Sequence, residues 1–206
     1  MTHFFAATLL ITLLVPAAPA DLQSGSVATE SIFKALGLQT GQTVCEMGAG
    51  DGELSLAAAR VVGAQGRVFT SELGEERIRA LRQKVSGSTA APITVVEGAP
   101  AQTNFPDGAC DAVFMRNVYH HFADPAAMNA SIAVALKPGA RLAIVDFSPP
   151  PGSEAPTAAD RGKDGMHGIT ADTLAREMAA AGFEPVASET GAQRWFMIVV
   201  AKPQSR

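Results

Sequence analysis

The sequence predicts an α/β protein built on a doubly wound, mostly parallel seven-stranded sheet that closes with a C-terminal antiparallel hairpin. Short apolar or β-branched runs alternate with segments of helical periodicity, which is typical of parallel β–α–β units. The last two strands are joined only by residues 190–193, a link too short for a parallel crossover. With 206 residues, 47% of them apolar, the chain can form one full core, and we see no repeat or second domain.

The individual elements follow from local patterns. Helices are expected over 26–38, where apolar residues recur at helical spacing, over the alanine-rich stretch 54–62, and over 75–85, which has an apolar stripe. Two more are expected over 125–136, which begins at a proline, and over 170–181, which begins at a threonine cap. The strands should span 43–45, 67–71, 93–97, 111–115, 141–147, 184–189 and 194–201. Lys137-Pro-Gly139 should stop the fourth helix. The stretch 148–167 has no periodicity and reads as a long functional loop.

A nucleotide-sized cradle is predicted where the first strand meets its helix. Three glycines stand at alternate positions, Gly48, Gly50 and Gly52. Glycines let a ligand approach the backbone, and the N–H groups of a helix start can face it. A dinucleotide pyrophosphate favours G-x-G-x-x-G, whereas here the spacing is G-x-G-x-G and follows an acid, Glu46. This carboxylate suits the cationic head of an amino acid, and Glu72 suits two ribose hydroxyls. S-adenosylmethionine satisfies both requirements.

The remaining site residues are expected beyond the carboxyl ends of the parallel strands, where ligands bind in open sheets. Further cofactor contacts are predicted at Ala49, Leu73, Gly98, Ala99, Arg116 and Asn117. Asp51 could reach the ligand or cap the next helix. His120, His121 and Asp146 are candidate catalytic residues, since an oxygen, nitrogen or carbon acceptor can need a base. The alternative is that 119–122 forms a packed lid with one histidine in solvent. His167 is a weaker candidate at the end of the loop.

Residues 44–148 resemble the class I S-adenosylmethionine-dependent methyltransferases. Four features carry the resemblance in order: Glu46-Met-Gly-Ala-Gly-Asp-Gly52 is similar to the first motif of the family, Glu72 to its ribose-binding acid, 105–111 to the segment before strand four, and 136–139 to the turn before strand five. The resemblance implies a Rossmann-like fold, S-adenosylmethionine as cofactor and methyl transfer to a small molecule.

Two details refine this resemblance. Arg116-Asn-Val118 and Val145-Asp-Phe-Ser148 also resemble the ubiquinone/menaquinone C-methyltransferase branch. Ala99 stands where the family often has an acid that meets the adenine amino group, so adenine should rest on backbone groups and apolar packing. The alternatives are an NAD-dependent oxidoreductase, which the glycine spacing and the closing hairpin disfavour, and an inactive exported binding or scaffold protein.

Composition restricts the partners and the compartment. A net charge of −4 without a run of Lys or Arg argues against a nucleic-acid surface, and no metal-ligand pattern stands out. Residues 4–15 are apolar and precede Pro16-Ala-Ala-Pro-Ala20, which predicts a signal peptide over 1–20, a domain over 21–206 and export. The alternative is an uncleaved membrane anchor, although the run is short for a span.

The two cysteines, Cys45 and Cys110, are predicted to be buried free thiols. In a regular parallel ladder Cys110 would lie about three residues, or near 10 Å, from the level of Cys45. Such an offset is beyond the range of a disulfide.

Overall fold

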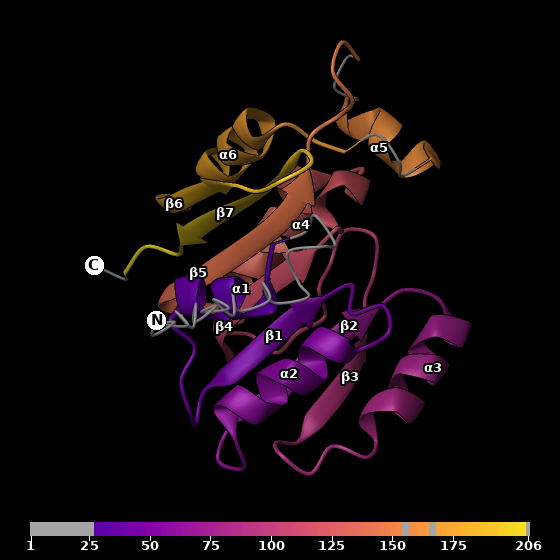
Figure 1. The fold of residues 1–206 in the computed structure, drawn as a ribbon, viewed down its shortest axis with the longest axis vertical. Helices are drawn as coiled ribbons and strands as arrows, with labels where there is room; N and C mark the ends of the chain where they lie inside the picture. Colours follow the sequence, from indigo (N-terminus) through magenta and orange to yellow (C-terminus); the bar gives the residue numbers. More distant parts are fainter. Residues whose placement is uncertain (1–26, 154–156, 165–167, 205–206) are drawn as a thin grey trace, which may run out of the picture.

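The structure, a computed structural model, describes residues 27–153, 157–164 and 168–204. The predicted signal segment and His167 lie outside these ranges. A single seven-stranded sheet has the order β3-β2-β1-β4-β5-β7-β6, in which only the pairs β5–β7 and β7–β6 are antiparallel. The predicted fold class and the closing hairpin are therefore confirmed (Figure 1).

The observed elements lie close to the predicted ones. The strands are β1 (Thr43–Met47), β2 (Arg67–Glu72), β3 (Ile93–Glu97), β4 (Cys110–Arg116), β5 (Leu136–Phe147), β6 (Glu184–Thr190) and β7 (Trp195–Ala201). The helices are α1 (Thr29–Leu36), α2 (Glu53–Val62), α3 (Glu75–Val85), the 3-10 helix η2 (Tyr119–His121), α4 (Pro125–Ala135), α5 (Ala158–Asp164) and α6 (Ala171–Ala180).

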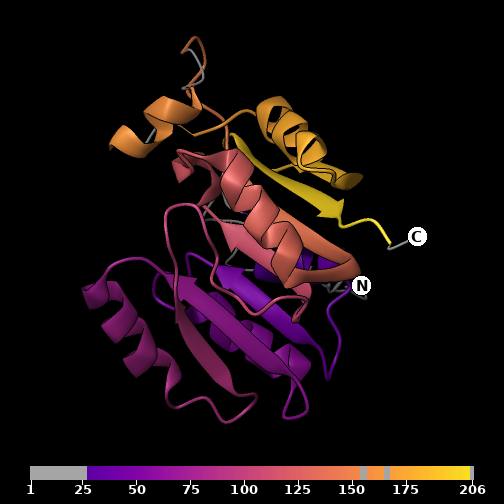
Figure 2. The same ribbon diagram turned by 180° about the vertical axis from the view of Figure 1, so that it is seen from behind.

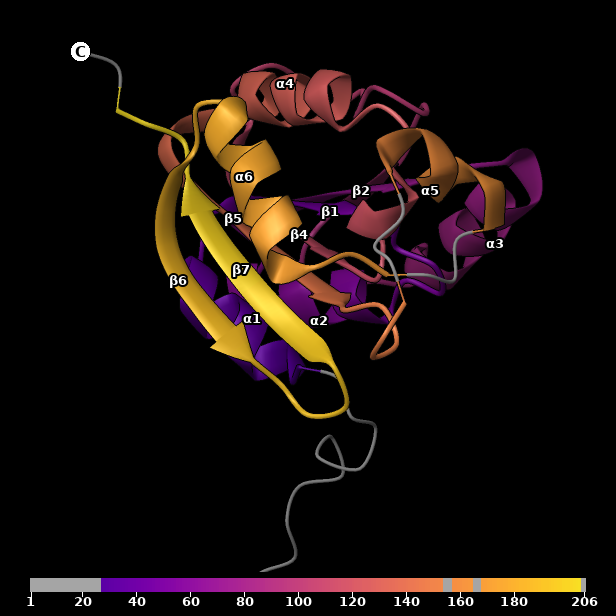
Figure 3. The ribbon, with the colours of Figure 1, turned by 90° about the horizontal axis from the view of Figure 1, so that it is seen from above.

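Helices cover both faces of the sheet, because its central strands are apolar on both sides. One face packs against α1 and α2 through residues such as Phe33 and Ala58, and the other packs against α4 and α6 through Ile132 and Met178. Figures 2 and 3 show these two helical layers with the strands between them. Parallel strands enclosed in this way bring the carboxyl ends of β1, β2, β4 and β5 to one common edge.

Two stretches differ from the prediction. Helix α4 ends at Ala135, one residue early, and β5 begins at Leu136 rather than after a turn. The residue before a proline disfavours helical dihedrals, and the backbone of Gly139 donates to Lys202 O, which holds this stretch on the sheet. The expected loop 148–167 also contains α5. A helix of about two turns is too short to produce a periodic pattern in the sequence.

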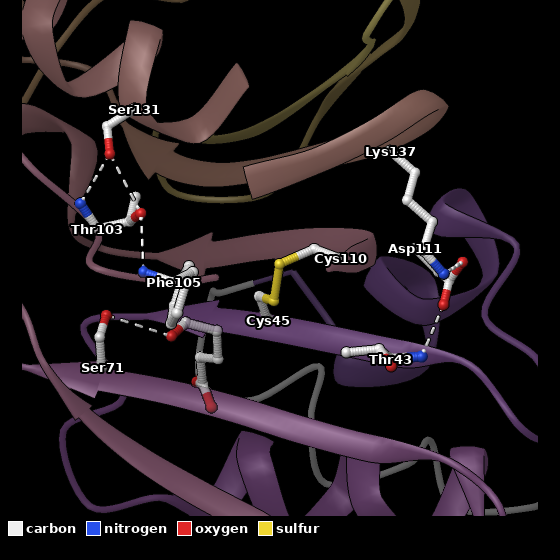
Figure 4. Close-up of a disulfide and its surroundings, with 10 residues drawn as sticks. Thr43, Cys45, Ser71, Thr103, Phe105, Cys110, Asp111, Ser131 and Lys137 are labelled. Atoms are coloured by element: carbon white, nitrogen blue, oxygen red, sulfur yellow. Dashed lines mark hydrogen bonds and ion pairs between the residues drawn. A yellow bond between two sulfur atoms is a disulfide. The ribbon is translucent and has the colours of Figure 1, made fainter. Parts of the chain in front are cut away.

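The prediction of two free thiols is wrong: Cys45 and Cys110 form a disulfide, with their Cα atoms 5.9 Å apart (Figure 4). The expected offset assumed that the regular ladder extends to Cys110. The ladder of β1 and β4 begins at Val44 and Ala112, so Cys110 lies before its first pair. The pairing of β4 with β5 shifts register at the same place, because Leu136 to Arg141 on β5 stand opposite Cys110 to Ala112. The Asp111 carboxylate accepts from the backbone N–H of Thr43 at 2.8 Å, which also holds the start of β4 against β1. Both cysteines are fully buried.

No helix within the described ranges has the length and hydropathy needed to cross a membrane.

Candidate cofactor and acceptor site

A cavity of about 820 Å³ opens at the carboxyl ends of β1, β2 and β4. It contains most of the side chains and glycines that the sequence singled out for the site. Its lining includes Glu46, Gly48, Ala49, Gly50, Asp51, Glu72, Leu73, Gly98, Ala99, Arg116, Asn117 and His121. The predicted residues Gly52, His120 and Asp146 do not line it. The sequence therefore located the cavity, whereas the roles of its residues remain predictions.

The three glycines serve different purposes. All have positive φ, which favours glycine. A Cβ atom on Gly48 would meet the Val118 side chain at 2.5 Å, and one on Gly52 would meet Leu81 at 2.7 Å, so these two allow close packing. Gly50 has open space where a Cβ would be. Its N–H donates to Glu72 Oε2 at 2.8 Å. The backbone at Gly50 is thus left accessible to a ligand.

Glu72 fixes the glycine loop and also lines the cavity. Its Oε1 accepts from the Leu73 backbone N–H at 2.8 Å and lies 3.6 Å from the exposed Arg77 guanidinium. The residue is only 7% exposed. Each carboxylate oxygen can accept more than one hydrogen bond, so the pair retains capacity for two hydroxyls of a ligand.

Glu46 lies at the end of β1 and is 2% exposed. Its carboxyl contacts the Ser55 hydroxyl, which is 2.8 Å from Thr70 Oγ1. Burial raises the pKa of Glu46 to about 8, although the Ser55 contact and the Arg116 charge oppose this rise. In neutral solution the free protein therefore holds this carboxyl mainly protonated, and an arriving cation would favour its ionised form.

Arg116 is the last residue of β4 and Asn117 follows it, on the opposite side of β1 from Glu72. Asn117 has φ 63°, a conformation that asparagine tolerates better than most residues. Its N–H donates to Val145 O at 2.8 Å. Asp51 fits both of its predicted roles, because its side chain accepts from Glu53 N–H at 3.2 Å while the residue lines the cavity.

His120 and His121 diverge as adjacent residues should. His121 lines the cavity, whereas His120 is buried and bound to Asp146. The Nδ1 nitrogen of His120 donates to Asp146 Oδ1 at 2.8 Å, since a carboxylate can only accept, and the backbone N–H of His120 donates to Oδ2 at 3.0 Å. The two imidazole rings are 4.0 Å apart. Partial burial lowers the pKa of His121, and the neighbouring His120 contributes to the same effect.

The wall on the β4 side is apolar. Its members, Val118, Phe122, Ala123 and Met128, come from the stretch after β4 and from the first turns of α4. A packed lid over 119–122 was the alternative to a catalytic role for the histidines, and of that stretch His121 and Phe122 line the cavity. The sequence analysis missed Met128, because an apolar residue near a helix start cannot be distinguished from a core residue. Arg77, Gln102 and Thr103 also line the cavity and were missed.

A buried polar cluster, consisting of Tyr119, Asn129, Arg161 and Glu177, supports this wall from behind. The Tyr119 hydroxyl donates to Glu177 Oε2 at 3.0 Å and accepts from Asn129 at 2.9 Å. Arg161, from α5, donates to both Glu177 oxygens at 3.0 and 2.6 Å and is only 3% exposed. Nothing in the sequence identified Arg161 or Glu177 as members of a buried cluster. Arg161 lies in the stretch that was expected to be a loop, and Glu177 lies on a helix face of mixed polarity.

Within the described ranges no group of three His, Cys, Asp or Glu side chains is placed to hold a metal ion.

Comparison with known proteins gives a consistent result. The family model described as "Methyltransferase domain" matches residues 45–144. The chain is 30% identical over 134 residues to the ubiquinone/menaquinone biosynthesis C-methyltransferase UbiE of Saccharophagus degradans, covering 63% of this chain and 54% of that protein. The chain thus spans about half the length of the curated relatives that it matches.

Solved structures share the fold. A SAM-dependent methyltransferase from Aquifex aeolicus aligns with a TM-score of 0.72 at 20% identity, over 90% of this chain and 98% of that one. The phosphoethanolamine N-methyltransferase 2 of Haemonchus contortus, in complex with S-adenosyl-L-methionine, aligns with a TM-score of 0.70 at 17% identity, over 85% of this chain and 52% of that one. These identities establish the architecture and leave the acceptor open.

Proposed function

We infer that this chain, a member of the class I S-adenosylmethionine-dependent methyltransferases, transfers a methyl group from S-adenosylmethionine to a small-molecule acceptor. The observation that carries the proposal is the pair of buried acids at the ends of neighbouring strands, Glu46 and Glu72, facing one cavity across an open glycine loop. The dinucleotide alternative is not favoured, because the matched family is a methyltransferase family.

The residues present fit this cofactor. Glu72 would accept the ribose hydroxyls, and its hold on Gly50 keeps the backbone in place for them. Glu46 would face the cationic amino-acid tail, with Arg116 near enough to influence its charge. Leu73, which is 46% exposed in the free protein, and Ala99 would pack on the adenine.

S-adenosylmethionine supplies a methyl group that its sulfonium has already activated. The protein therefore contributes mainly alignment and the exclusion of water. The apolar wall formed by Val118, Phe122 and Met128 would exclude water on the β4 side, where the acceptor would enter. The likeness to UbiE makes an aromatic ring of quinone type a reasonable first acceptor to test.

Calorimetry on the full chain tests the proposal. We expect S-adenosylmethionine to bind at one site and NAD not to bind. Glu72→Gln should weaken binding about 10- to 150-fold, since a charge-assisted hydrogen bond contributes about 1.5–3 kcal/mol. The matched control is Glu75→Gln, whose carboxylate is exposed at the start of α3. Binding of NAD alone would refute the methyltransferase function, and binding of neither ligand would favour the scaffold alternative.

We also propose that the protein is exported. The support is the apolar run 4–15, the A-x-A pattern at Ala18 and Ala20, and the buried disulfide, a bond that persists in oxidising compartments. Mass spectrometry of the protein from its native host should find Asp21 at the N-terminus. An intact N-terminus in the membrane fraction would instead support the anchor.

A further inference from the structure

We propose that His121 is the base that takes the proton from the methyl acceptor, and that Asp146 and His120 are positioning residues that hold it. This inference rests on the proposed function and adds a substrate class: acceptors whose reacting atom must lose a proton, such as a hydroxyl or an acidic carbon, rather than a thiolate.

The three carboxyl groups that line the cavity already have hydrogen-bond partners in the protein, and Glu46 and Glu72 are assigned to the cofactor. Both oxygens of Glu72 accept backbone N–H groups, the Glu46 carboxyl is bound to Ser55, and Asp51 accepts from the first turn of α2. The two remaining groups, Arg77 and Arg116, are guanidinium cations and cannot accept a proton. Among the described residues that line the cavity, His121 is therefore the base best placed for an acceptor.

His121 also lies on the correct side. It belongs to the wall that follows β4, together with Val118, Phe122 and Met128. The ribose-binding candidate Glu72 ends β2, two strands away in the sheet order, and neighbouring strands are about 4.8 Å apart. A nucleoside held at Glu72 would thus direct its far end toward the β4 side, where His121 faces the cavity.

Asp146 holds the histidine pair in place. Its carboxylate is fully buried and accepts three hydrogen bonds, two from His120 and one from the Phe147 backbone N–H at 2.9 Å. Because both the ring and the backbone of His120 are bound, this residue has little rotational freedom. The His121 ring lies 4.0 Å from it, tilted by 40°, so the orientation of His120 limits that of His121.

The charge state of His121 suits a base. Burial lowers its pKa from the usual 6.5, and His120 and Arg77 lower it further, while Asp146 opposes them. The imidazole is therefore neutral at pH 7 and can accept a proton. Activity that depends on this base should rise with pH through that lowered pKa and then level off.

The step balances as a proton transfer coupled to an alkyl transfer. The acceptor X–H bond breaks and its proton moves to the free ring nitrogen of His121. The electron pair left on X forms the new bond to the methyl carbon, while the carbon–sulfur bond breaks and its electrons stay on sulfur, giving S-adenosylhomocysteine. The imidazolium then returns its proton to water.

The first test is an NMR titration of the histidine rings in the full chain, which has four histidines, with His121→Gln used for assignment. We expect His121 to titrate below 6.5. Asp146→Asn should lower this midpoint further, since it removes the opposing charge. Asp111→Asn is the control, because Asp111 pairs with Lys137 at the other end of β4. If Asp146→Asn fails to fold, His120→Gln should raise the midpoint instead.

A His121 midpoint at or above 6.5, or one that neither variant moves, overturns the proposal. This titration needs no acceptor and no cofactor. The proposed function fails separately, if the wild type does not bind S-adenosylhomocysteine.

The second test compares methyl transfer to phenol and benzenethiol, which share a ring and differ in the reacting atom. His121→Gln should bind S-adenosylhomocysteine as the wild type does, within about threefold. It should transfer to phenol at least about 100-fold more slowly. Transfer to benzenethiol should change by less than about threefold, because thiols ionise without help near neutral pH. Equal losses for both acceptors, or a wild type that methylates only the thiol, would contradict the inference.

Discussion

Replacing Glu46 by Gln should remove a pH dependence that the buried carboxyl imposes on both folding and cofactor binding. Burial raises the pKa of Glu46 from 4.5 to about 8 in the folded protein. A group whose pKa is raised by folding stabilises the fold fully below its unfolded pKa, and this stabilisation is lost as pH rises through the folded pKa. The wild type should therefore lose stability between about pH 5 and pH 8.

The magnitude follows from the same values. The interval from 4.5 to about 8, at about 1.4 kcal/mol per tenfold change in proton activity, corresponds to at most about 5 kcal/mol of unfolding free energy. Glu46→Gln keeps a polar group beside Ser55 but cannot ionise, so its unfolding free energy should lack this slope. The advantage of the variant over the wild type should grow steadily with pH.

Cofactor binding should show the complementary effect. With a pKa of about 8, only about 1% of Glu46 is ionised at pH 6 and about half at pH 8, so wild-type affinity for S-adenosylhomocysteine should rise roughly 50-fold over this interval. The affinity of Glu46→Gln should be flat. The variant should bind about as well as the wild type at pH 6 and about 10- to 100-fold more weakly at pH 8.

Two assays measure these effects. Urea unfolding at a series of pH values can be followed through Trp195, the one tryptophan of the sequence, and binding can be followed by calorimetry. Glu53→Gln is the control, because Glu53 is exposed at the start of α2 and lies outside the cavity. Wild-type stability and affinity that stay constant between pH 5 and pH 8 would show that Glu46 is already ionised in the free protein, and the reasoning would fail.

Two further predictions concern stability. Reduction of the disulfide, which joins residues 65 positions apart, should lower the unfolding free energy by about 4 kcal/mol. The effect is measured as the shift of the urea midpoint between samples with and without a phosphine reductant. An unchanged midpoint would mean that the thiols are free. Arg161→Met should cost about 2–4 kcal/mol in the same assay, because it leaves Glu177 with an unpaired charge in a largely buried site. The control is Arg176→Met, a change at an exposed arginine on the same helix as Glu177, and an equal effect of both variants would contradict a special role for the buried pair.

Local patterns predicted what depends on local chemistry. The positive φ of Gly48 and Gly52 and the acid at the end of β2 follow from the needs of a turn and a ligand, and each leaves a mark in a few consecutive residues. The succession of strands and helices along the chain from β1 to β5, and the parallel pairing that it implies, follow in the same way from alternating periodicity. The predicted site therefore coincides with much of the observed cavity.

The features that escaped prediction depend on contacts between distant segments. The disulfide joins Cys45 to a residue that lies just before the regular ladder of β1 and β4 begins, and no residue type indicates where that ladder begins. The ion pair between Arg161 and Glu177 joins the short helix α5 to α6. In the sequence, each of these residues taken alone is typical of a charged side chain in solvent. The two hydrogen bonds between Asp146 and His120 likewise depend on β5 lying beside β4. This arrangement brings the end of β5 next to the 3-10 helix η2, which follows β4.

The two cavity acids are neighbours on β1 and β2, yet their surroundings differ in a way that separates recognition of the nucleoside from recognition of the tail. Backbone N–H groups already bind both oxygens of Glu72 in the free protein, whereas the Glu46 carboxyl has only a hydroxyl contact in a buried position. Adenosine, which lacks the amino-acid tail, should therefore bind with an affinity that is constant between pH 6 and pH 8 in both the wild type and Glu46→Gln. Calorimetry with adenosine and with S-adenosylhomocysteine measures this difference directly. If the affinity for adenosine also rises with pH, the pH dependence does not arise from binding of the amino-acid tail. Glu46 would then not be the group that faces the cation of that tail.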